Sequence, residues 1–197
     1  KGLNDVITVD VVHPLMPATS WQFGEFPGST PDTVNGQSNM KEVYQLAEPN
    51  FDGVVTVPVL WDKKRNTVVN NESSEIIRMF NSAFNDIGNA DLDLYPEPLR
   101  QEIEQINEEI YETVNNGVYR SGFAKSQEAY EKAFDALFKT LDHLEERLSK
   151  KRYLVGEQLT EADWRLFTTL VRFDPVYHGH FKCNKKRLTE YPNLWNY

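Results

Sequence analysis

The sequence predicts an α/β module followed by a larger all-α module. Three features of the chain support this prediction. Runs of β-branched residues, which are typical of strands, lie within the first 84 residues, mixed with helical patterns. Asp, Asn, Gly and Pro then gather over residues 85–98, and helical periodicity dominates residues 99–197. We therefore expect an α/β domain over residues 1–84, a linker over 85–98 and a helical domain over 99–197.

The composition excludes several classes of protein. The chain has 197 residues, of which 40% are hydrophobic, so it can bury substantial cores. Its net charge of -9 argues against a surface that neutralises phosphates, and no nucleic-acid partner is expected. The single cysteine cannot form an internal disulfide, and no apolar run approaches the roughly 20 residues that span a membrane. These features predict a cytoplasmic protein without a membrane segment.

The first module begins with a predicted strand and a long loop. Residues 6–12 are rich in β-branched side chains and apolar on both faces, which predicts an inner strand. Residues 15–38 contain many Pro, Gly, Ser and Thr residues without a period, and predict a surface loop that carries Trp21. Residues 41–47 predict a short helix.

A proline interrupts the next predicted strand. Residues 54–61 have an extended pattern, but Pro58 lacks the N–H group that a strand ladder needs. Pro58 must therefore lie at a strand start, an edge or a special turn, and a cis peptide bond is one explanation. The polar residues 62–66 and the apolar run 67–70 complete a predicted hairpin.

The helix that follows the hairpin could hold a small zwitterion. Asn70 or Asn71 is its predicted N-cap, and its predicted buried residues are Ile76, Ile77, Phe80 and Phe84. If Pro58 is cis, the Val57 N–H and C=O can pair with the backbone of a ligand. The helix start offers N–H groups and the Ser73 hydroxyl to a carboxylate, while Glu72 can accept from an ammonium group.

The second module contains four predicted helices. Apolar residues recur every three or four positions in two of them, at Leu99, Ile103, Ile106, Ile110 and Val114, and at Ala133, Leu137, Leu141, Leu144 and Leu148. Thr160 and Asp163 form a capping box for a third, whose predicted apolar face is Leu166, Phe167, Leu170, Val171 and Phe173. Pro192 predicts a last helix, which we expect to end before it can bury anything.

Five segments carry a family resemblance: 57–62 (VPVLWD), 70–78 (NNESSEIIR), 115–124 (NNGVYRSGFA), 159–163 (LTEAD) and 173–177 (FDPVY). Together they resemble the xi class of glutathione transferases, the glutathionyl-hydroquinone reductases. The resemblance covers the whole chain. It implies the glutathione-transferase fold, with an incomplete thioredoxin-like domain followed by a helical bundle domain, and a homodimer.

The resemblance implies glutathione as a cosubstrate, held by the first module, and aromatic glutathionyl-hydroquinones as substrates. Val57 beside the proline would hold the cysteinyl backbone, while Glu72 and Ser73 would hold the γ-glutamyl end and Trp21 would add a contact. The implied glutathione-binding residues are Trp21, Val54, Val55, Thr56, Val57, Pro58, Glu72 and Ser73. Tyr119 would donate or accept a proton, and Tyr177 would donate a hydrogen bond to a cysteine thiolate and so lower its pKa.

The implied reaction needs a nucleophilic cysteine at the start of the first helix of the fold, and these 197 residues do not include that segment. This cysteine would attack the glutathionyl sulfur, release the hydroquinone and form a mixed disulfide that a second glutathione resolves. In the family it starts the first helix, in a segment that would precede Lys1. We therefore expect this chain to be an internal piece of a longer enzyme, inactive alone.

Several alternatives remain open at this stage. Cys183 is interpreted as a structural thiol rather than the nucleophile, although neighbouring lysines could lower its pKa. His178, His180 and Cys183 have a spacing that could share a metal ion, but no paired ligand cluster accompanies them and no metal is expected. A thiol transferase of the omega type and a non-catalytic glutathione-binding module are the competing functions. Without the resemblance, Tyr119 and Tyr177 would be read as packing residues.

Overall fold

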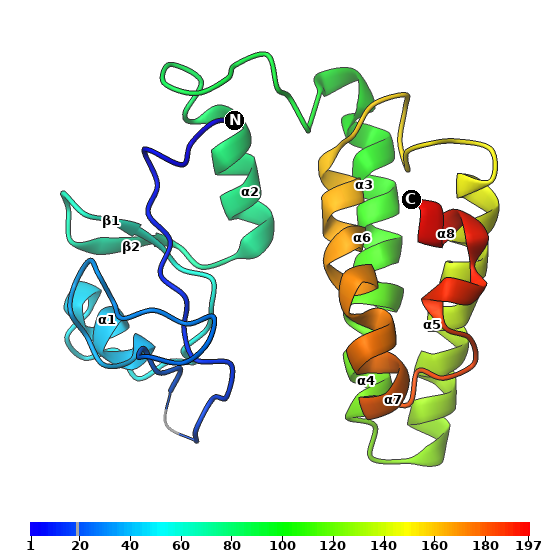
Figure 1. Ribbon diagram of the computed structural model, residues 1–197, viewed down its shortest axis with the longest axis horizontal. Helices are drawn as coiled ribbons and strands as arrows, with labels where there is room; N and C mark the ends of the chain where they lie inside the picture. The colour runs from blue at the N-terminus through cyan, green and yellow to red at the C-terminus, as the bar shows by residue number, and fades with distance from the viewer. Residues whose placement is uncertain (19) are drawn as a thin grey trace. The chain divides into compact units, whose positions relative to one another are not determined.

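The computed structural model describes residues 1–18 and 20–197, which form two compact units (Figure 1). The first unit is Lys1–Leu92 and the second is Asp93–Tyr197. The division lies within residues 85–98, the segment that the sequence indicates as a linker.

The first unit contains a hairpin between two helices. Its elements are α1 (Met40–Ala47), β1 (Leu60–Asp62), β2 (Thr67–Asn70) and α2 (Ser73–Ser82). The strands are antiparallel, with Leu60 opposite Asn70 and Asp62 opposite Thr67. Backbone N–H groups of Arg65 and Lys64 donate to the Asp62 carboxylate and hold its pKa below the usual value. The predicted hairpin and the predicted short helix are confirmed.

A small hydrophobic cluster fixes α1 in this unit. Asn39 caps the helix by accepting a hydrogen bond from the Glu42 N–H. Three buried residues of the helix form the centre of the cluster, and partly buried side chains from the loop and the strand region surround it. The centre is Met40, Val43 and Tyr44, and the surrounding residues are Val12, Trp21, Phe23, Phe51, Val55, Val59 and Trp61.

The strand predicted over residues 6–12 is wrong. This segment is extended but forms no strand ladder within the described residues, and Val9 is 74% exposed. The segment is held by Thr30, which makes two hydrogen bonds with Val11: the Thr30 N–H donates to the Val11 carbonyl, and the Thr30 hydroxyl accepts from the Val11 N–H. β-branched residues favour extended backbone, but a strand also needs a hydrogen-bonded neighbour. The predicted loop over 15–38 has only an isolated bridge, Gln22 to Asn39, among its described residues; Thr19 lies outside them.

The start of α2 also differs from the prediction. Glu72 is the N-cap, and its side chain accepts a hydrogen bond from the Ser74 N–H. Asn70 instead accepts from the Glu72 N–H at 2.7 Å, and the Asn71 amide donates to the Tyr44 hydroxyl at 3.0 Å. Of the four predicted buried residues only Ile76 is buried, and Ile77, Phe80 and Phe84 are partly exposed.

The second unit is a helical bundle. Its elements are η1 (Glu97–Leu99), α3 (Arg100–Ile110), η2 (Tyr111–Asn115), α4 (Gly117–Gly122), α5 (Gln127–Leu148), α6 (Glu161–Arg172), η3 (Phe173–Tyr177), α7 (His178–His180), η4 (Leu188–Glu190) and α8 (Pro192–Asn196). Figure 1 shows α3 beside α6, and α8 beside α5. Eight of the ten predicted apolar positions lie in one continuous core and Leu99 packs against it, whereas Ala133 is only partly buried and lies outside this core.

Two expectations for this unit are wrong. Phe167 and Val171 of α6 are 47% and 55% exposed, because α6 directs Leu166 and Leu170 into the core and turns its other face outward. Helix α8 does bury a residue, Leu194. The carboxylate of Glu145 on α5 accepts from the N–H groups at the start of α8, which satisfies this helix end and holds it on the bundle.

The capping box at the start of α6 is confirmed and extends beyond the helix. Asp163 is buried and accepts hydrogen bonds from the N–H and the hydroxyl of Thr160. It also accepts from the Leu154 N–H at 2.9 Å and from the Tyr197 hydroxyl at 2.6 Å. One carboxylate therefore joins the α5–α6 loop, the start of α6 and the segment after α8.

Replacing this carboxylate should destabilise the protein strongly. Asp163→Ala leaves buried donors without partners, and we expect the free energy of unfolding to fall by about 3–5 kcal/mol. Urea denaturation followed by circular dichroism measures the change. Asp135→Ala, which removes an exposed carboxylate from α5, is the control and should change stability by less than about 0.5 kcal/mol. Equal effects of the two variants would contradict the role of Asp163.

Candidate functional site

The peptide bond between Val57 and Pro58 is cis, which is one of the explanations that the sequence suggested for a proline within this apolar run. Val57 is 37% exposed, and its backbone N–H and C=O make no hydrogen bond within the described part of the chain. These two groups can therefore pair with the backbone of an extended ligand.

A hydrogen-bond network supports the residues before the proline. The Tyr44 hydroxyl on α1 donates to the Thr56 carbonyl at 3.1 Å, and the Asn71 amide donates to the Tyr44 hydroxyl and to Thr56 Oγ1. Val55 packs against the cluster around α1, whereas Val54 is 83% exposed. The supporting role of Tyr44 is not predicted from the sequence, and Asn71 is predicted there only as a helix cap. The contacts join three segments that are separate in the sequence, so no local pattern indicates them.

The start of α2 presents the carboxylate of Glu72 beside the N–H group of Ser73, which makes no hydrogen bond within the described residues. Oε1 of Glu72 accepts from the N–H and the hydroxyl of Ser74, at 3.3 and 3.2 Å. Glu72 and Ser73 are both exposed. The first turn of this helix can bind a carboxylate, and Glu72 can accept a hydrogen bond from an ammonium group.

Trp21 is anchored to α1. Its side chain is partly buried and packs against the α1 cluster, and its carbonyl accepts from the Met40 N–H at 2.9 Å. This anchoring fixes the loop around Trp21. A contact of Trp21 with glutathione stays a prediction.

Tyr119 and Tyr177, the two tyrosines singled out in the sequence, lie together in the helical unit. Their hydroxyl oxygens are 3.2 Å apart, within hydrogen-bond distance. Tyr177 is buried, while Tyr119 is 41% exposed. Burial raises the pKa of Tyr177 to about 12, with a further contribution from the hydrogen bond with Tyr119, whereas the nearby Arg172 guanidinium acts in the opposite direction. The Tyr177 hydroxyl therefore stays protonated at neutral pH.

Two π-helical turns position this pair. The η2 turn precedes α4, which carries Tyr119, and the η3 turn ends at Tyr177. The Asn115 amide fixes η2 to α6 through the Arg165 carbonyl at 3.1 Å and Thr169 Oγ1 at 2.7 Å. A π turn adds a residue and so rotates the following helix face. The sequence pattern predicted a plain helix here and missed both turns.

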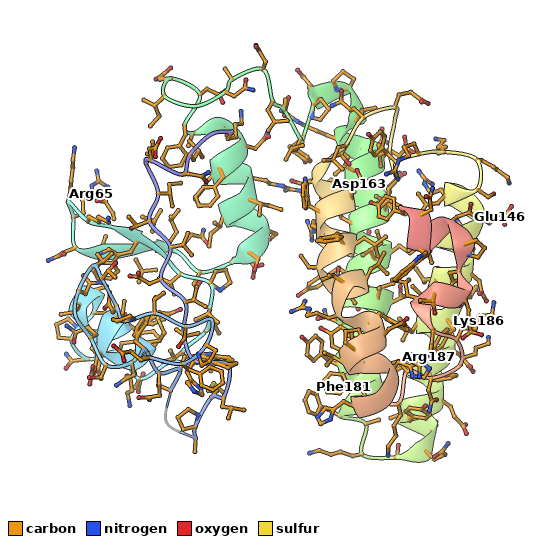
Figure 2. All side chains as sticks on the ribbon, viewed as in Figure 1. Arg65, Glu146, Asp163, Phe181, Lys186 and Arg187 are labelled. Carbon is orange, nitrogen blue, oxygen red and sulfur yellow. The ribbon has the colours of Figure 1, made fainter. Side chains whose placement is uncertain are left out.

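Two phenylalanines complete the surroundings of the pair. Phe123 stacks on Tyr119 with ring centroids 6.4 Å apart, and Phe181 contacts the rings of both tyrosines. Figure 2 shows Phe181 at the end of the bundle where α4 and α7 lie. The sequence did not predict either phenylalanine as part of the site. Phe123 lies in one of the five segments that carry the resemblance, and the segment of Phe181 was considered only for metal binding. Both lie within four residues of a predicted site tyrosine, which is the sequence feature that could have identified them.

Cys183 is fully buried. Burial raises the pKa of its thiol to about 11, although the Ser121 hydroxyl acts in the opposite direction. Neighbouring lysines, which could have lowered this pKa, do not offset the effect of burial, and the burial agrees with the interpretation of Cys183 as a structural thiol. Within residues 1–18 and 20–197, no group of three or more His, Cys, Asp and Glu side chains could hold a metal ion. None of the described helices combines the length and the apolar character needed to cross a membrane.

The buried thiol should react slowly. At pH 8 a thiol of pKa about 11 is ionised about a hundredfold less than one of pKa about 9, so Cys183 should react with Ellman's reagent at least about a hundredfold more slowly in the folded protein than in guanidinium chloride. Stopped-flow absorbance with peptide mapping of the labelled site measures both rates. Equal rates would contradict the burial of Cys183.

Comparisons with known proteins identify a matching family and similar proteins. The family described as "Glutathione S-transferase, C-terminal domain" matches residues 127–197. The chain is 55% identical over 194 residues to the glutathionyl-hydroquinone reductase PcpF of Sphingobium chlorophenolicum, covering 98% of this chain and 62% of the relative. It is 54% identical over 198 residues to the glutathionyl-hydroquinone reductase YqjG of Escherichia coli, covering 100% and 60%. The chain thus spans about 60% of the length of these curated relatives.

Solved structures give the same result. The glutathione-bound structure of YqjG from Escherichia coli is similar with a TM-score of 0.97 and 55% identity, over 99% of this chain and 64% of that chain. The crystal structure of glutathione transferase Xi 1 from Trametes versicolor is similar with a TM-score of 0.94 and 56% identity, over 98% and 68%.

Proposed function

Because this chain belongs to the xi class of glutathione transferases, we propose that it is part of a glutathione-dependent reductase that converts glutathionyl-hydroquinones to hydroquinones. The observation that carries the proposal is the pair of hydroxyls on Tyr119 and Tyr177, 3.2 Å apart, in a chain 55% identical to a protein named as such a reductase. The fold expected from the resemblance agrees with the glutathione-transferase neighbours.

Glutathione is the proposed cosubstrate, and the first unit supplies its contacts. Two features support this assignment. The unpaired backbone groups of Val57 suit the cysteinyl residue of the tripeptide. The start of α2 suits its γ-glutamyl end, which carries both an ammonium group and a carboxylate. Glu72 takes the ammonium group, and the N–H and hydroxyl of Ser73 take the carboxylate.

The proposed reaction passes through a mixed disulfide. A cysteine thiolate attacks the glutathionyl sulfur, the bond between that sulfur and the ring carbon breaks, and the ring carbon takes a proton. A second glutathione thiolate then attacks the mixed disulfide and releases oxidised glutathione and the cysteine thiolate. In this scheme Tyr119 exchanges the proton, and Tyr177, protonated at neutral pH, donates a hydrogen bond to the thiolate.

We assign the nucleophile to a cysteine outside these 197 residues. Cys183 is the single cysteine here, and it is buried with a raised pKa, which opposes formation of the thiolate. The aromatic hydroquinone substrate, a homodimeric state and a cytoplasmic location are parts of the same proposal.

A thiol transferase of the omega type is the second candidate. A relative from Schizosaccharomyces pombe that is 52% identical over 190 residues carries the name "Glutathione S-transferase omega-like 2". Turnover of a glutathionyl-hydroquinone in competition with an alkyl mixed disulfide separates the two activities. Preference for the disulfide would favour the omega type, and absence of turnover of both would favour a non-catalytic glutathione-binding module.

Removal of the Tyr119 hydroxyl should slow turnover. In the full-length protein we expect Tyr119→Phe to lower kcat on a glutathionyl-hydroquinone by about a hundredfold, because the proton transfer loses its side chain. The Kd for glutathione should stay within about twofold. Tyr111→Phe removes an exposed hydroxyl upstream of Tyr119 and is the matched control. Equal turnover of Tyr119→Phe and the unsubstituted protein would refute this role.

Removal of the Glu72 charge should weaken glutathione binding. Glu72→Gln keeps an oxygen for the helix cap but removes the charge that attracts the ammonium group, so the glutathione Kd measured by calorimetry should rise about tenfold. Glu75→Gln changes an exposed carboxylate in the first turn of the same helix and should leave the Kd within about twofold. An identical response of the two variants would show that Glu72 does not bind the ligand.

A further inference from the structure

We propose that Phe181 is a positioning residue that holds the hydroxyl of Tyr119 against that of Tyr177, an inference that rests on the proposed function of this pair. The ring centroid of Phe181 lies 5.4 Å from that of Tyr119, with the rings nearly perpendicular, and 5.4 Å from that of Tyr177. Phe181 therefore contacts both rings of the pair.

The position of Phe181 is fixed by close packing against α4. Gly122 faces its ring, and a Cβ atom at this position would lie 2.7 Å from Cδ1 of Phe181, well inside van der Waals contact. Glycine thus allows the ring to approach the helix that carries Tyr119. A larger residue at position 122 would displace the ring.

The backbone around Phe181 is held on both sides. The N–H groups of Phe181 and Cys183 both donate to the Tyr177 carbonyl, at 3.2 and 3.1 Å. Lys182 between them adopts φ of +59°, and its carbonyl accepts a hydrogen bond from the Tyr130 hydroxyl at 2.7 Å. The buried side chain of Cys183 completes the anchor. This arrangement gives Cys183 a structural role and directs Phe181 toward the tyrosines.

Tyr119 depends on Phe181 more than Tyr177 does. Tyr177 is buried within its own π turn, whereas Tyr119 is 41% exposed. The other phenylalanine on Tyr119, Phe123, is itself 69% exposed and also packs on Phe181, with centroids 5.1 Å apart. The Tyr119 ring also meets the ring of Tyr177 edge-on, with centroids 5.7 Å apart. Loss of the Phe181 ring would leave that single contact with a buried residue, which is too little to keep the hydroxyl of Tyr119 against that of Tyr177.

A double-mutant cycle tests this coupling without relying on catalysis. The full-length protein is labelled with tyrosine carrying ¹³C at Cζ, and the Tyr119 resonance is assigned with Tyr119→Phe. Tyr177→Phe should shift the Tyr119 resonance, because the hydrogen-bond partner is lost. In a Phe181→Ala background the same substitution should cause less than about a fifth of that shift. Phe181→Leu, which retains apolar volume, should behave like Phe181→Ala and serves if the alanine variant does not fold.

Controls and turnover separate this inference from the proposed function. Phe167→Ala, which removes an exposed ring of α6, should retain the full response of the Tyr119 resonance to Tyr177→Phe, and Phe181→Tyr should restore that response.

We expect Phe181→Ala and Gly122→Ala to lower kcat about tenfold with the glutathione Kd within about twofold. An undiminished response in Phe181→Ala would overturn the positioning role. Loss of the response with unchanged kcat would support the positioning role and contradict the proposed function of the tyrosine pair.

Discussion

The helical unit depends on one buried carboxylate, that of Asp163. It accepts four hydrogen bonds, from both donors of Thr160, from the Leu154 N–H and from the Tyr197 hydroxyl. A buried charge without these donors would be strongly unfavourable, so the donors fix where α6 begins. Helix α6 leads directly into the π turn that ends at Tyr177. The hydrogen bonds of Asp163 therefore fix the start of the helix whose other end leads to Tyr177.

The two units achieve their functional geometry in a similar way. In the first, the hydroxyl of Tyr44 on α1 links Thr56 to Asn71, so a helix supports the segment before the cis proline. In the second, Asn115 links its π turn to α6. In both cases the residues with the proposed chemistry are held by polar side chains from other segments. Such support holds exposed groups such as Val57 and Tyr119 in place.

Local chemistry explains which features the sequence could predict. Thr160 with Asp163, the polar turn after Asp62 and the proline in an apolar run each specify a local conformation, and all three predictions are confirmed. The strand prediction for residues 6–12 is wrong because a β-branched run does not indicate whether a neighbouring strand exists. The π turns and Phe181 were missed because they depend on contacts between helices. The roles of Tyr119 and Tyr177 came from the family resemblance, since tyrosines on helices pack in cores far more often than they react.

The central claim is that the described residues serve a cysteine that lies outside this chain. The most direct test treats the full-length gene product with a limiting amount of a glutathionyl-hydroquinone, quenches it with acid and maps glutathione adducts by peptide mass spectrometry. We predict a glutathione mixed disulfide on a cysteine outside these 197 residues, release of the hydroquinone, and an unmodified Cys183. A glutathione adduct on Cys183, or hydroquinone release without an adduct on any cysteine, would contradict the account.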